Sequence, residues 1–500
     1  MDREESVFDV RRRGREATEA GLTPLTTGHN HSGMELRVKH SGRDWQQKVF
    51  FVAGIFNLFF FASHVFSQAS LFDSSFQIGA GANGAVNAIL VQQDGKIMVG
   101  GEFTVIVGQT NAYLARLNSD GQLDASFGSG TDGIVNHLLQ LPDGKVLVAG
   151  EFTNLQGVAR HSLGRLLTNG LVDLSFDAGT NFESDEIVRT ICLQSDGKIV
   201  TASEKVLVGY LMSRFSRFHP DGQLDTSFVR TNPALSSVFA LLPLTNGTIL
   251  AGGGFHGLGT PSYSGLALLG EDGQVDINFV SLLTNYSTVF SLTELTNGNI
   301  LVGGLLNLTG LNRQEAVAQL TPLWQWDTNF VTDEFEFPWG ATVRCVLIQP
   351  DEKIVVGGLF QEVGGYWRRH IARLDSQGHV DPCFDPGLGL GNFDGARALA
   401  RQSDGCILVG GSFDSTQWFG VANLARLLPQ SDCGAMRTYL LNSGGGMVSI
   451  GTCPPGGTNL LQMSTNLVDW QTMDTQTVPY VFWVVDTTQP KAFFRVKKVF

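Results

Sequence analysis

The sequence has few cysteines, and none of them is placed as a metal ligand would be. Its 500 residues hold six cysteines, with no C-x-x-C pair and no histidine at zinc-site spacing. It also lacks a convincing G-x-S-x-G, H-E-x-x-H or phosphate-loop motif. We therefore expect no metal, no cofactor and no catalytic residue, and nothing in the motifs indicates an enzyme.

Basic residues are also few, and acidic residues outnumber them. The chain has 34 Lys and Arg against 47 Asp and Glu, a formal net charge of −13. Such a charge repels phosphate backbones and anionic lipid surfaces, so nucleic-acid binding is disfavoured. Charged residues make up only 16 % of the chain while glycine occurs 60 times, which is typical of many short strands joined by tight turns.

Near the N-terminus lies a mostly apolar segment, residues 49–66, preceded by basic residues and followed by Ser67-Gln68-Ala69. This order is that of a signal peptide, so we expect cleavage after Ala69 and an exported protein that is secreted, periplasmic or at the cell surface, without a membrane attachment afterwards. The first 69 residues are then an N-terminal extension and signal peptide, with Met34 as an alternative start. An uncleaved anchor remains the alternative, because the segment is just long enough to span a bilayer.

Three signatures recur seven times each, in fixed order and 49 to 54 residues apart. The first is a hydrophobic-Asp-x-x-Phe element, with Asp73, Asp124, Asp173, Asp225, Asp276, Asp327 and Asp381. The second is an Asp-Gly or Asn-Gly turn, with Gly95, Gly144, Gly197, Gly247, Gly298 and Gly405, and with Asp351-Glu352 in the sixth repeat. The third is a short apolar strand, at 114–118, 163–167, 215–219, 266–270, 317–321, 371–375 and 424–428.

Each unit of about 50 residues reads as four strands, with the Asp-Gly pair as a type I′ hairpin turn. The pattern predicts an all-β protein, a seven-bladed β-propeller of four-stranded blades over residues 70–430. A small β-sandwich-like module is expected at 431–500. The array opens on a lone Asp-x-x-Phe element at 72–76 and closes on a strand at 424–428, so we expect these two to pair and close the ring.

These motifs resemble the delta-60 repeat family of bacterial exported proteins. The first repeat, VQQDGKIMVGGEF at 91–103 followed by LARLNSDG at 114–121, matches that pattern almost throughout. Repeats three to five depart from it, with TASEK at 201–205 in place of the glycine-rich strand end. The resemblance implies a propeller fold and export, and it implies no catalytic activity.

The repeated aspartates could form a ring of carboxylates, but a residue present in every unit is better explained as a turn-forming one. Function is expected in loops that differ between units. The candidate ligand-binding residues there are Trp367, Trp418, Tyr366, Arg368, His370, Trp339 and Tyr263. Exposed aromatic and polar groups suit sugar stacking or protein contact, and local packing under their own loops is the alternative.

Three functional hypotheses follow, of which a monomeric binding or scaffold module for an extracellular protein or glycan is the first. The second is a polysaccharide-active hydrolase or lyase, for which the variable loops offer carboxylates at Glu183, Asp185, Asp333, Glu334 and Glu336. The third is a purely structural surface protein. Cys433 and Cys453 lie close together in the sequence and could form a disulfide in an oxidising compartment.

Overall fold

The computed structural model describes most of residues 71–429 and five later strands. The gaps in the first range are 180, 184, 208–209, 229–236, 259–262, 285, 310–313, 339, 385, 387–389, 391–394 and 414–420. All described residues belong to one compact unit, Ser67–Phe500. Their regular elements are β-strands, and no helix that could cross a membrane occurs among them. The predicted all-β class is confirmed, while the expected signal peptide lies outside the described residues.

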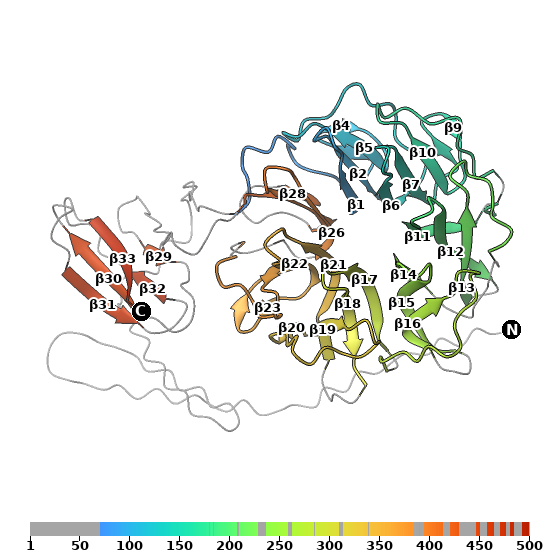
Figure 1. Ribbon diagram of the computed structural model, residues 1–500. Coiled ribbons are helices and arrows are strands. Elements are labelled where there is room, and N and C mark those ends of the chain that lie inside the picture. The colour runs from blue at the N-terminus through green and yellow to red at the C-terminus, as the bar shows by residue number, and fades with distance from the viewer. Residues whose placement is uncertain are drawn as a thin grey trace, which may run out of the picture. The chain divides into compact units, whose positions relative to one another are not determined.

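Seven three-stranded antiparallel sheets with one common strand pattern make up the described part of residues 71–429 (Figure 1). Along the chain they are β1 (Val86–Val91), β2 (Ile97–Gly101) and β5 (Leu114–Leu117); β6 (Val135–Gln140), β7 (Val146–Gly150) and β10 (Leu163–Leu166); β11 (Ile187–Leu193), β12 (Ile199–Leu207) and β13 (Tyr210–Phe218); β14 (Val238–Pro243), β15 (Ile249–Leu258) and β16 (Tyr263–Leu269); β17 (Thr288–Glu294), β18 (Ile300–Asn307) and β19 (Gln314–Leu320); β21 (Thr342–Ile348), β22 (Ile354–Leu359) and β25 (Ile371–Leu374); β26 (Gly395–Arg401), β27 (Ile407–Ser412) and β28 (Leu424–Leu427).

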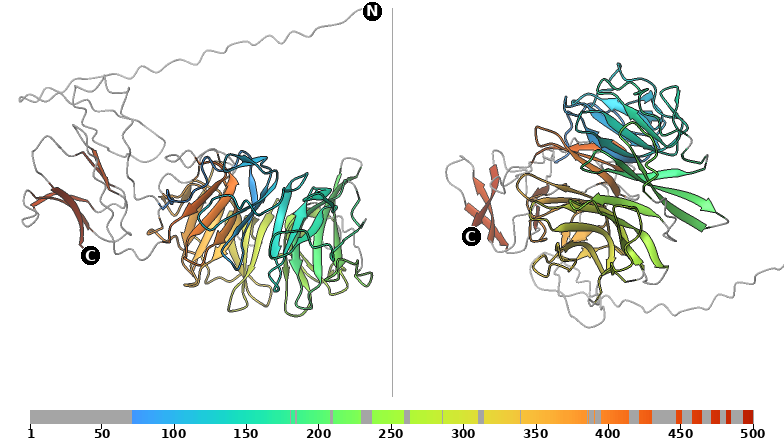
Figure 2. Two further views of the ribbon diagram at one scale, coloured as in Figure 1. Left: turned by 90° about the horizontal axis from the view of Figure 1, so that it is seen from above. Right: turned by 45° about the vertical axis from the view of Figure 1, so that its right-hand side comes forward.

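The first strand of each sheet lies at the centre of a ring. β1, β6, β11, β14, β17, β21 and β26 contact one another in that order, and β26 contacts β1 again (Figures 1 and 2). The hydrophobic core lies between neighbouring sheets, as where Met98 and Leu114 pack with Val135 of the next sheet. This close packing explains the repeated glycines of the second strand, since a Cβ on Gly100 would stand 2.5 Å from Val135 Cγ1.

The fourth strand expected in each unit is reduced to a single β-bridge. In the first unit, Leu123 forms a bridge with Leu117 and the Asp124 N–H donates to the Arg116 carbonyl at 2.9 Å. The chain then turns, because the Phe127 N–H donates back to the Asp124 carbonyl at 3.0 Å. The Asp-x-x-Phe element therefore ends pairing after one bridge, and the sheets have three strands where four were predicted.

The Asp-Gly hairpins lie where the sequence predicts them, but the type I′ conformation was wrong. Gly95 has φ of +83°, whereas Asp94 is absent from the residues with positive φ, which a type I′ turn requires at both central positions. The Gly95 N–H donates to the Gln92 carbonyl at 2.9 Å, and the Gln92 N–H donates to the Lys96 carbonyl at 2.8 Å. The loop is thus a three-residue connection that ends in a left-handed glycine.

The predicted pairing of the two ends of the repeat array is confirmed. Phe72 forms an antiparallel bridge with Leu427, and the Asp73 N–H donates to the Arg426 carbonyl at 2.8 Å. The N-terminal segment thus occupies the same place on β28 that each Asp-x-x-Phe element occupies on the sheet of its own repeat. This pairing covers a sheet edge that would otherwise be exposed.

Three smaller sheets lie in the loops of the ring, and five further strands come after it in the sequence. They are β3 (Val105–Ile106) with β4 (Gln109–Thr110), β8 (Asn154–Leu155) with β9 (Val158–Ala159), and β20 (Phe335–Glu336) with β23 (Glu362–Val363) and β24 (Tyr366–Trp367). In the C-terminal part, β29 (Met447–Ile450) pairs with β32 (Val481–Val484), and β30 (Thr458–Ser464) lies between β31 (Gln471–Gln476) and β33 (Phe493–Val499). The domain limits at 70–430 and 431–500 stay predictions.

Candidate functional site

The repeated aspartates form ion pairs with the repeated arginines, an arrangement we call the clasp. In the first unit Arg116 Nε lies 2.7 Å from Asp124 Oδ2, and its guanidinium stacks over Phe127 at 5.1 Å from the ring centroid. The same clasp forms in five units: Arg116–Asp124, Arg165–Asp173, Arg217–Asp225, Arg373–Asp381 and Arg426–Asp73. In four of these units the carboxylate joins a strand to the turn that follows it, and in the fifth Asp73 joins the N-terminal segment to β28.

The clasp also sets the ionisation of its aspartates. Burial acts to raise the pKa of Asp124, but hydrogen bonds from Ser126 and Lys96 and the charge of Arg116 outweigh it and hold that pKa well below its ordinary value. Asp173 and Asp225 have their pKa lowered in the same way by a serine two residues on and by their clasp arginines. These carboxylates are therefore charged structural groups at neutral pH, which supports the turn-forming interpretation.

Two units lack the clasp arginine. Leu268 stands in its place in the fourth unit and Gln319 in the fifth. Asp327 of the fifth unit instead accepts a hydrogen bond from Asn299 Nδ2 at 3.1 Å. The repeat is therefore least regular over residues 229–348.

The candidate binding residues are not all at the surface. Trp339 and Trp418 lie outside the described residues, and Tyr263 is described by its backbone alone, in β16. Tyr366, Arg368 and His370 are buried, with 7 %, 0 % and 2 % of their surfaces exposed, whereas Trp367 is 39 % exposed.

The buried members of this group pack beneath their own loop. Arg368 stacks over the Tyr366 ring and donates to the Trp367 and Pro382 carbonyls at 2.9 and 3.0 Å. His370 Nδ1 lies 3.1 Å from the Gly358 carbonyl. Their burial favours the local-packing alternative for these three, and it leaves Trp367 as the described side chain of this group that a ligand can reach.

Trp367 lies in a row with two glutamates across the small sheet β20–β23–β24. Glu336 is directly opposite Glu362, and Glu362 is directly opposite Trp367. Directly opposite residues of an antiparallel pair project to the same side of a sheet, so these three side chains form what we call the acidic row. Phe335, Val363 and Tyr366 alternate with them and pack into the core on the other side.

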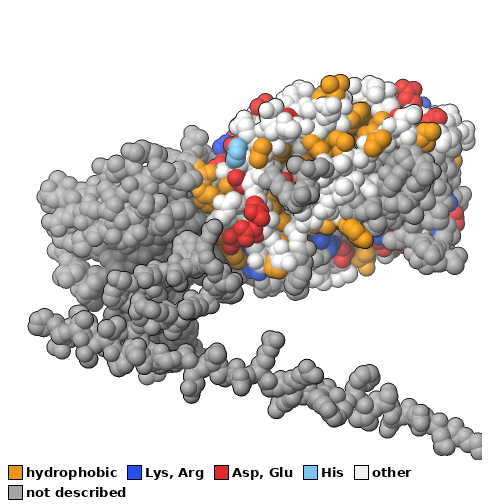
Figure 3. Space-filling model, turned by 90° about the horizontal axis from the view of Figure 1, so that it is seen from below, with side chains coloured by type: hydrophobic (Ala, Val, Ile, Leu, Met, Phe, Trp, Pro, Cys, Tyr) orange, Lys and Arg blue, Asp and Glu red, His pale blue; other side chains and the backbone are white. Residues whose placement is uncertain are grey.

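A hollow of about 700 Å³ adjoins the acidic row. It is lined by two phenylalanines, two glutamines and four glutamates, among other residues: Phe335, Phe337, Gln314, Gln361, Glu315, Glu334, Glu336 and Glu362. The view from below, toward the edge where β20 and β23 lie in Figure 1, shows acidic side chains gathered in a patch (Figure 3). The groups at this hollow are carboxylate acceptors beside aromatic rings.

Within the part of the chain that the structure describes, the two carboxylates of the acidic row and the adjacent Glu334 have no cationic partner. Among the described residues, Glu334, Glu336 and Glu362 have no ion pair or side-chain hydrogen bond. Glu315 differs, because it is buried and accepts a hydrogen bond from Thr332 Oγ1 at 2.9 Å. Asp333 also differs, since its Oδ2 accepts from the Val380 N–H at 2.6 Å.

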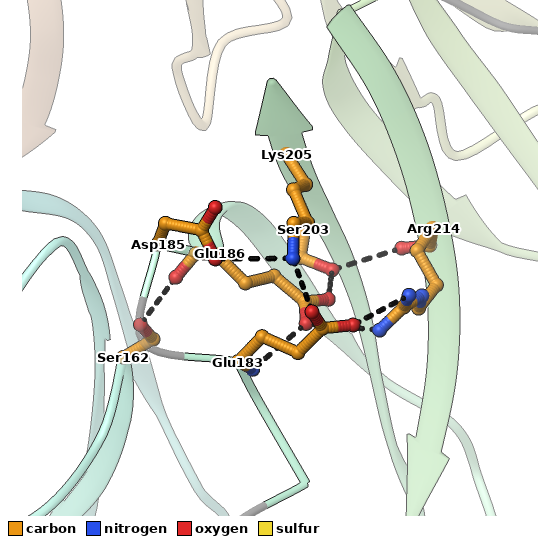
Figure 4. A network of polar contacts seen from close by, with 7 residues as sticks. All are labelled: Ser162, Glu183, Asp185, Glu186, Ser203, Lys205 and Arg214. Carbon is orange, nitrogen blue, oxygen red and sulfur yellow. Dashed lines mark hydrogen bonds and ion pairs between the residues drawn. The ribbon is translucent and has the colours of Figure 1, made fainter. Parts of the chain in front are cut away.

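Two other carboxylates that the sequence analysis considered for catalysis, Glu183 and Asp185, form ion pairs. Arg214 Nη2 lies 3.1 Å from Glu183 Oε1, and Lys205 Nζ lies 3.2 Å from Asp185 Oδ1 and also pairs with Glu183 (Figure 4). Hydrogen bonds from Lys205 and Arg214 lower the pKa of Glu183. The network continues to the buried Glu186, whose Oε2 is 3.0 Å from Arg214 Nη1. These groups fix β12 and β13 to the preceding loop.

Within the described residues, no group of three or more His, Cys, Asp or Glu is arranged to hold a metal ion. Cys192, Cys345 and Cys406 are buried free thiols, and burial raises the pKa of Cys192 and Cys345 to about 12. Cys383 is disulfide-bonded. The predicted bridge between Cys433 and Cys453 lies outside the described residues.

Comparison with known proteins agrees with the fold. Five segments match a family model described as a domain of unknown function (DUF5122) beta-propeller: residues 92–127, 141–176, 194–228, 349–384 and 402–432. These segments leave out residues 229–348, the units in which Leu268 and Gln319 replace the clasp arginine. No curated protein matches the sequence.

The solved structures that match this chain are distant from it in sequence. The extracellular domain of a one-component system from B. thetaiotaomicron is 10 % identical with a TM-score of 0.42, and the match covers 85 % of this chain and 58 % of that chain. The calcium-binding protein regucalcin from Agrobacterium tumefaciens is 11 % identical with a TM-score of 0.36, covering 59 % of this chain and 86 % of that one. PorZ, a surface component of the type-IX secretion system of Porphyromonas gingivalis, is 11 % identical with a TM-score of 0.35, covering 83 % and 66 %. The family matches and the ring of sheets together support a β-propeller fold for this part of the chain.

Proposed function

We propose that this protein is an exported, seven-bladed propeller that acts as a binding module for an extracellular protein partner. The contact centres on the acidic row, Glu336, Glu362 and Trp367, and the partner contributes a lysine or arginine side chain to it. The observation that carries the proposal is the pair of directly opposed glutamates, which have no cationic partner among the described residues, beside an exposed tryptophan.

Like charges directly opposite each other destabilise a sheet, so Glu336 and Glu362 lower the stability of β20 and β23 in the free protein. An ammonium or guanidinium group placed between them would remove that repulsion. Trp367, opposite Glu362, would add a cation–π contact with the same group. Relief of the repulsion and the cation–π contact both favour a cationic ligand over a neutral or anionic one.

Two features support export. The sequence carries an apolar segment at 49–66 that basic residues precede, as in a secretory signal. Cys383 is disulfide-bonded, and disulfides persist in oxidising compartments outside the cytoplasm.

The test is capture of synthetic peptides that carry one lysine or arginine, each compared with the same peptide carrying glutamine there. We expect the cationic peptides to bind, and binding to weaken as salt is raised. Trp367→Ala should lower the affinity for the cationic peptides about thirtyfold, as for a tryptophan at an interface centre. Glu362→Gln should also lower that affinity.

Two exposed positions elsewhere provide matched controls. Leu323→Ala removes an exposed apolar side chain, and Glu294→Gln removes an exposed charge at the end of β17. Both should leave capture unchanged. The proposal fails if Trp367→Ala and Glu362→Gln bind the cationic peptides as the unmodified protein does while their melting temperatures are unchanged.

A further inference from the structure

The innermost strand of all seven sheets carries a β-bulge at the same place. In each strand the register shifts by one residue directly after an early valine or alanine, and the unpaired residues are Asn87, Asn136, Arg189, Phe239, Phe290, Arg344 and Arg397. A bulge re-aims one side chain and is frequent beside binding sites. The preceding residue is valine in six strands, whereas the bulged residue is asparagine, arginine or phenylalanine. Packing alone therefore does not determine which residue occupies the bulge.

We call these seven side chains the central ring, and several of them contact one another across neighbouring sheets. Arg397 Nη1 donates to Asn87 Oδ1 at 2.8 Å across the seam between the last sheet and the first. On the other side, the Phe239 and Phe290 rings stack with centroids 4.8 Å apart, and Arg344 lies over Phe290 at 5.8 Å. All seven residues are half-buried, so solvent reaches each of them.

The charges on the polar side of the central ring are balanced. Arg189 Nε lies 2.8 Å from Glu204 Oε2, with Glu151 at 3.5 Å from its Nη1. Arg397 Nη1 lies 2.7 Å from Glu102 Oε1. The polar side therefore presents oriented N–H donors and carboxylate acceptors with little net charge, while the aromatic side presents two phenylalanines.

We propose that the central ring is a binding site for a neutral sugar. Sugar hydroxyls both donate and accept hydrogen bonds, so they match the paired arginine and glutamate groups and the amide oxygen of Asn136. The amide nitrogens of Asn87 and Asn136 already donate to the Val135 and Val188 carbonyls. The C–H face of a pyranose ring is apolar and packs on aromatic side chains such as Phe239. An anionic ligand fits less well, because Glu102, Glu151 and Glu204 already neutralise two of the arginines. This site is separate from the acidic row.

The test is a glycan array that carries neutral oligosaccharides and uronate-containing oligosaccharides of equal length, probed with the full mature chain. We expect binding to neutral members. Phe239→Leu and Asn136→Ser should each lower that binding about tenfold or more with little change in melting temperature. Glu362→Gln, in the acidic row, should bind sugars normally, which separates this site from the proposed protein contact.

A measurement on the unmodified protein covers the case in which both variants fold poorly. With a bound oligosaccharide, hydrogen exchange should slow in β1, β11, β14 and β17 and stay unchanged in β23 and β24. Absence of binding to every neutral oligosaccharide overturns the proposal, as does binding to uronate members alone. Protection confined to the outer strands overturns it as well.

Discussion

At the level of single residues, the clasp is the feature that most strongly ties the sequence signature to the fold. Arg116 is nearly fully buried and depends on Asp124 for its charge balance. Removing one partner of such a buried pair leaves an uncompensated charge, which costs more than the pair itself contributes. The arginine also covers Phe127, so one side chain links the turn, the strand and the aromatic ring.

We predict that Asp124→Asn lowers the free energy of unfolding by about 3 kcal/mol at neutral pH. The pKa of Asp124 is held below its ordinary value of 3.8 in the folded protein, so its stabilisation is present above about pH 4 and is lost as the pH falls. The free energy of unfolding, measured with urea at neutral and acidic pH, should therefore change less with pH in the variant than in the unmodified protein. Asp276→Asn is the control, because Leu268 replaces the arginine there; equal effects of the two substitutions would contradict the clasp.

At the level of elements, the N-terminal segment acts as the closing piece of the last sheet. We predict that a chain beginning at residue 77 melts at a lower temperature and aggregates more readily than one beginning at residue 70. The truncation removes the Phe72–Leu427 bridge and exposes the edge of β28. Thermal unfolding and size-exclusion chromatography measure both effects. Identical melting curves would mean that residues 71–76 contribute nothing to closure.

Much of this element order is predictable from the repeat. The three signatures predict the hairpin positions, the ring closure and the structural role of aspartates such as Asp124. The missing fourth strand was not predicted, because the turn made by Asp124 and Phe127 interrupts pairing and strand patterns do not reveal it. The hairpin conformation was missed for a similar reason, since Asp-Gly suits both a two-residue and a three-residue loop.

The candidate sites were only partly predictable. Trp367 was identified, but its neighbour Glu362 was not, although Gly364 and Gly365 between Glu362-Val363 and Tyr366-Trp367 are a hairpin signal. Burial of Arg368 and His370 depends on contacts with distant segments such as Gly358 and Pro382, which local sequence does not report. The sequence does show that the residue after the early valine or alanine of each innermost strand varies from repeat to repeat. Only the bulges show that these variable residues lie at equivalent places around the ring.

At the level of the whole molecule, ring closure implies that the seam between the last and first sheets is packed like the others. A Cβ added to Gly410 of β27 would collide with Val86 of β1, as one added to Gly100 would collide with Val135. The seam is further joined by Arg397 and Asn87. The seam between the last and first sheets is therefore closed by the same kind of contact as the one between the first two sheets.

We therefore predict that Gly410→Val and Gly100→Val are destabilising to a similar extent, by about 1–3 kcal/mol, the usual effect of overpacking a core. Valine is the sharper probe because Ala149 and Ala202 occupy the corresponding positions in the second and third sheets. Chemical unfolding of the two variants beside the unmodified chain measures the effect. If Gly100→Val is destabilising and Gly410→Val is neutral, the seam is loose and the sheets form an open arc. Equal losses mean that the last and first sheets pack as tightly as the first and second do, as expected of a closed ring.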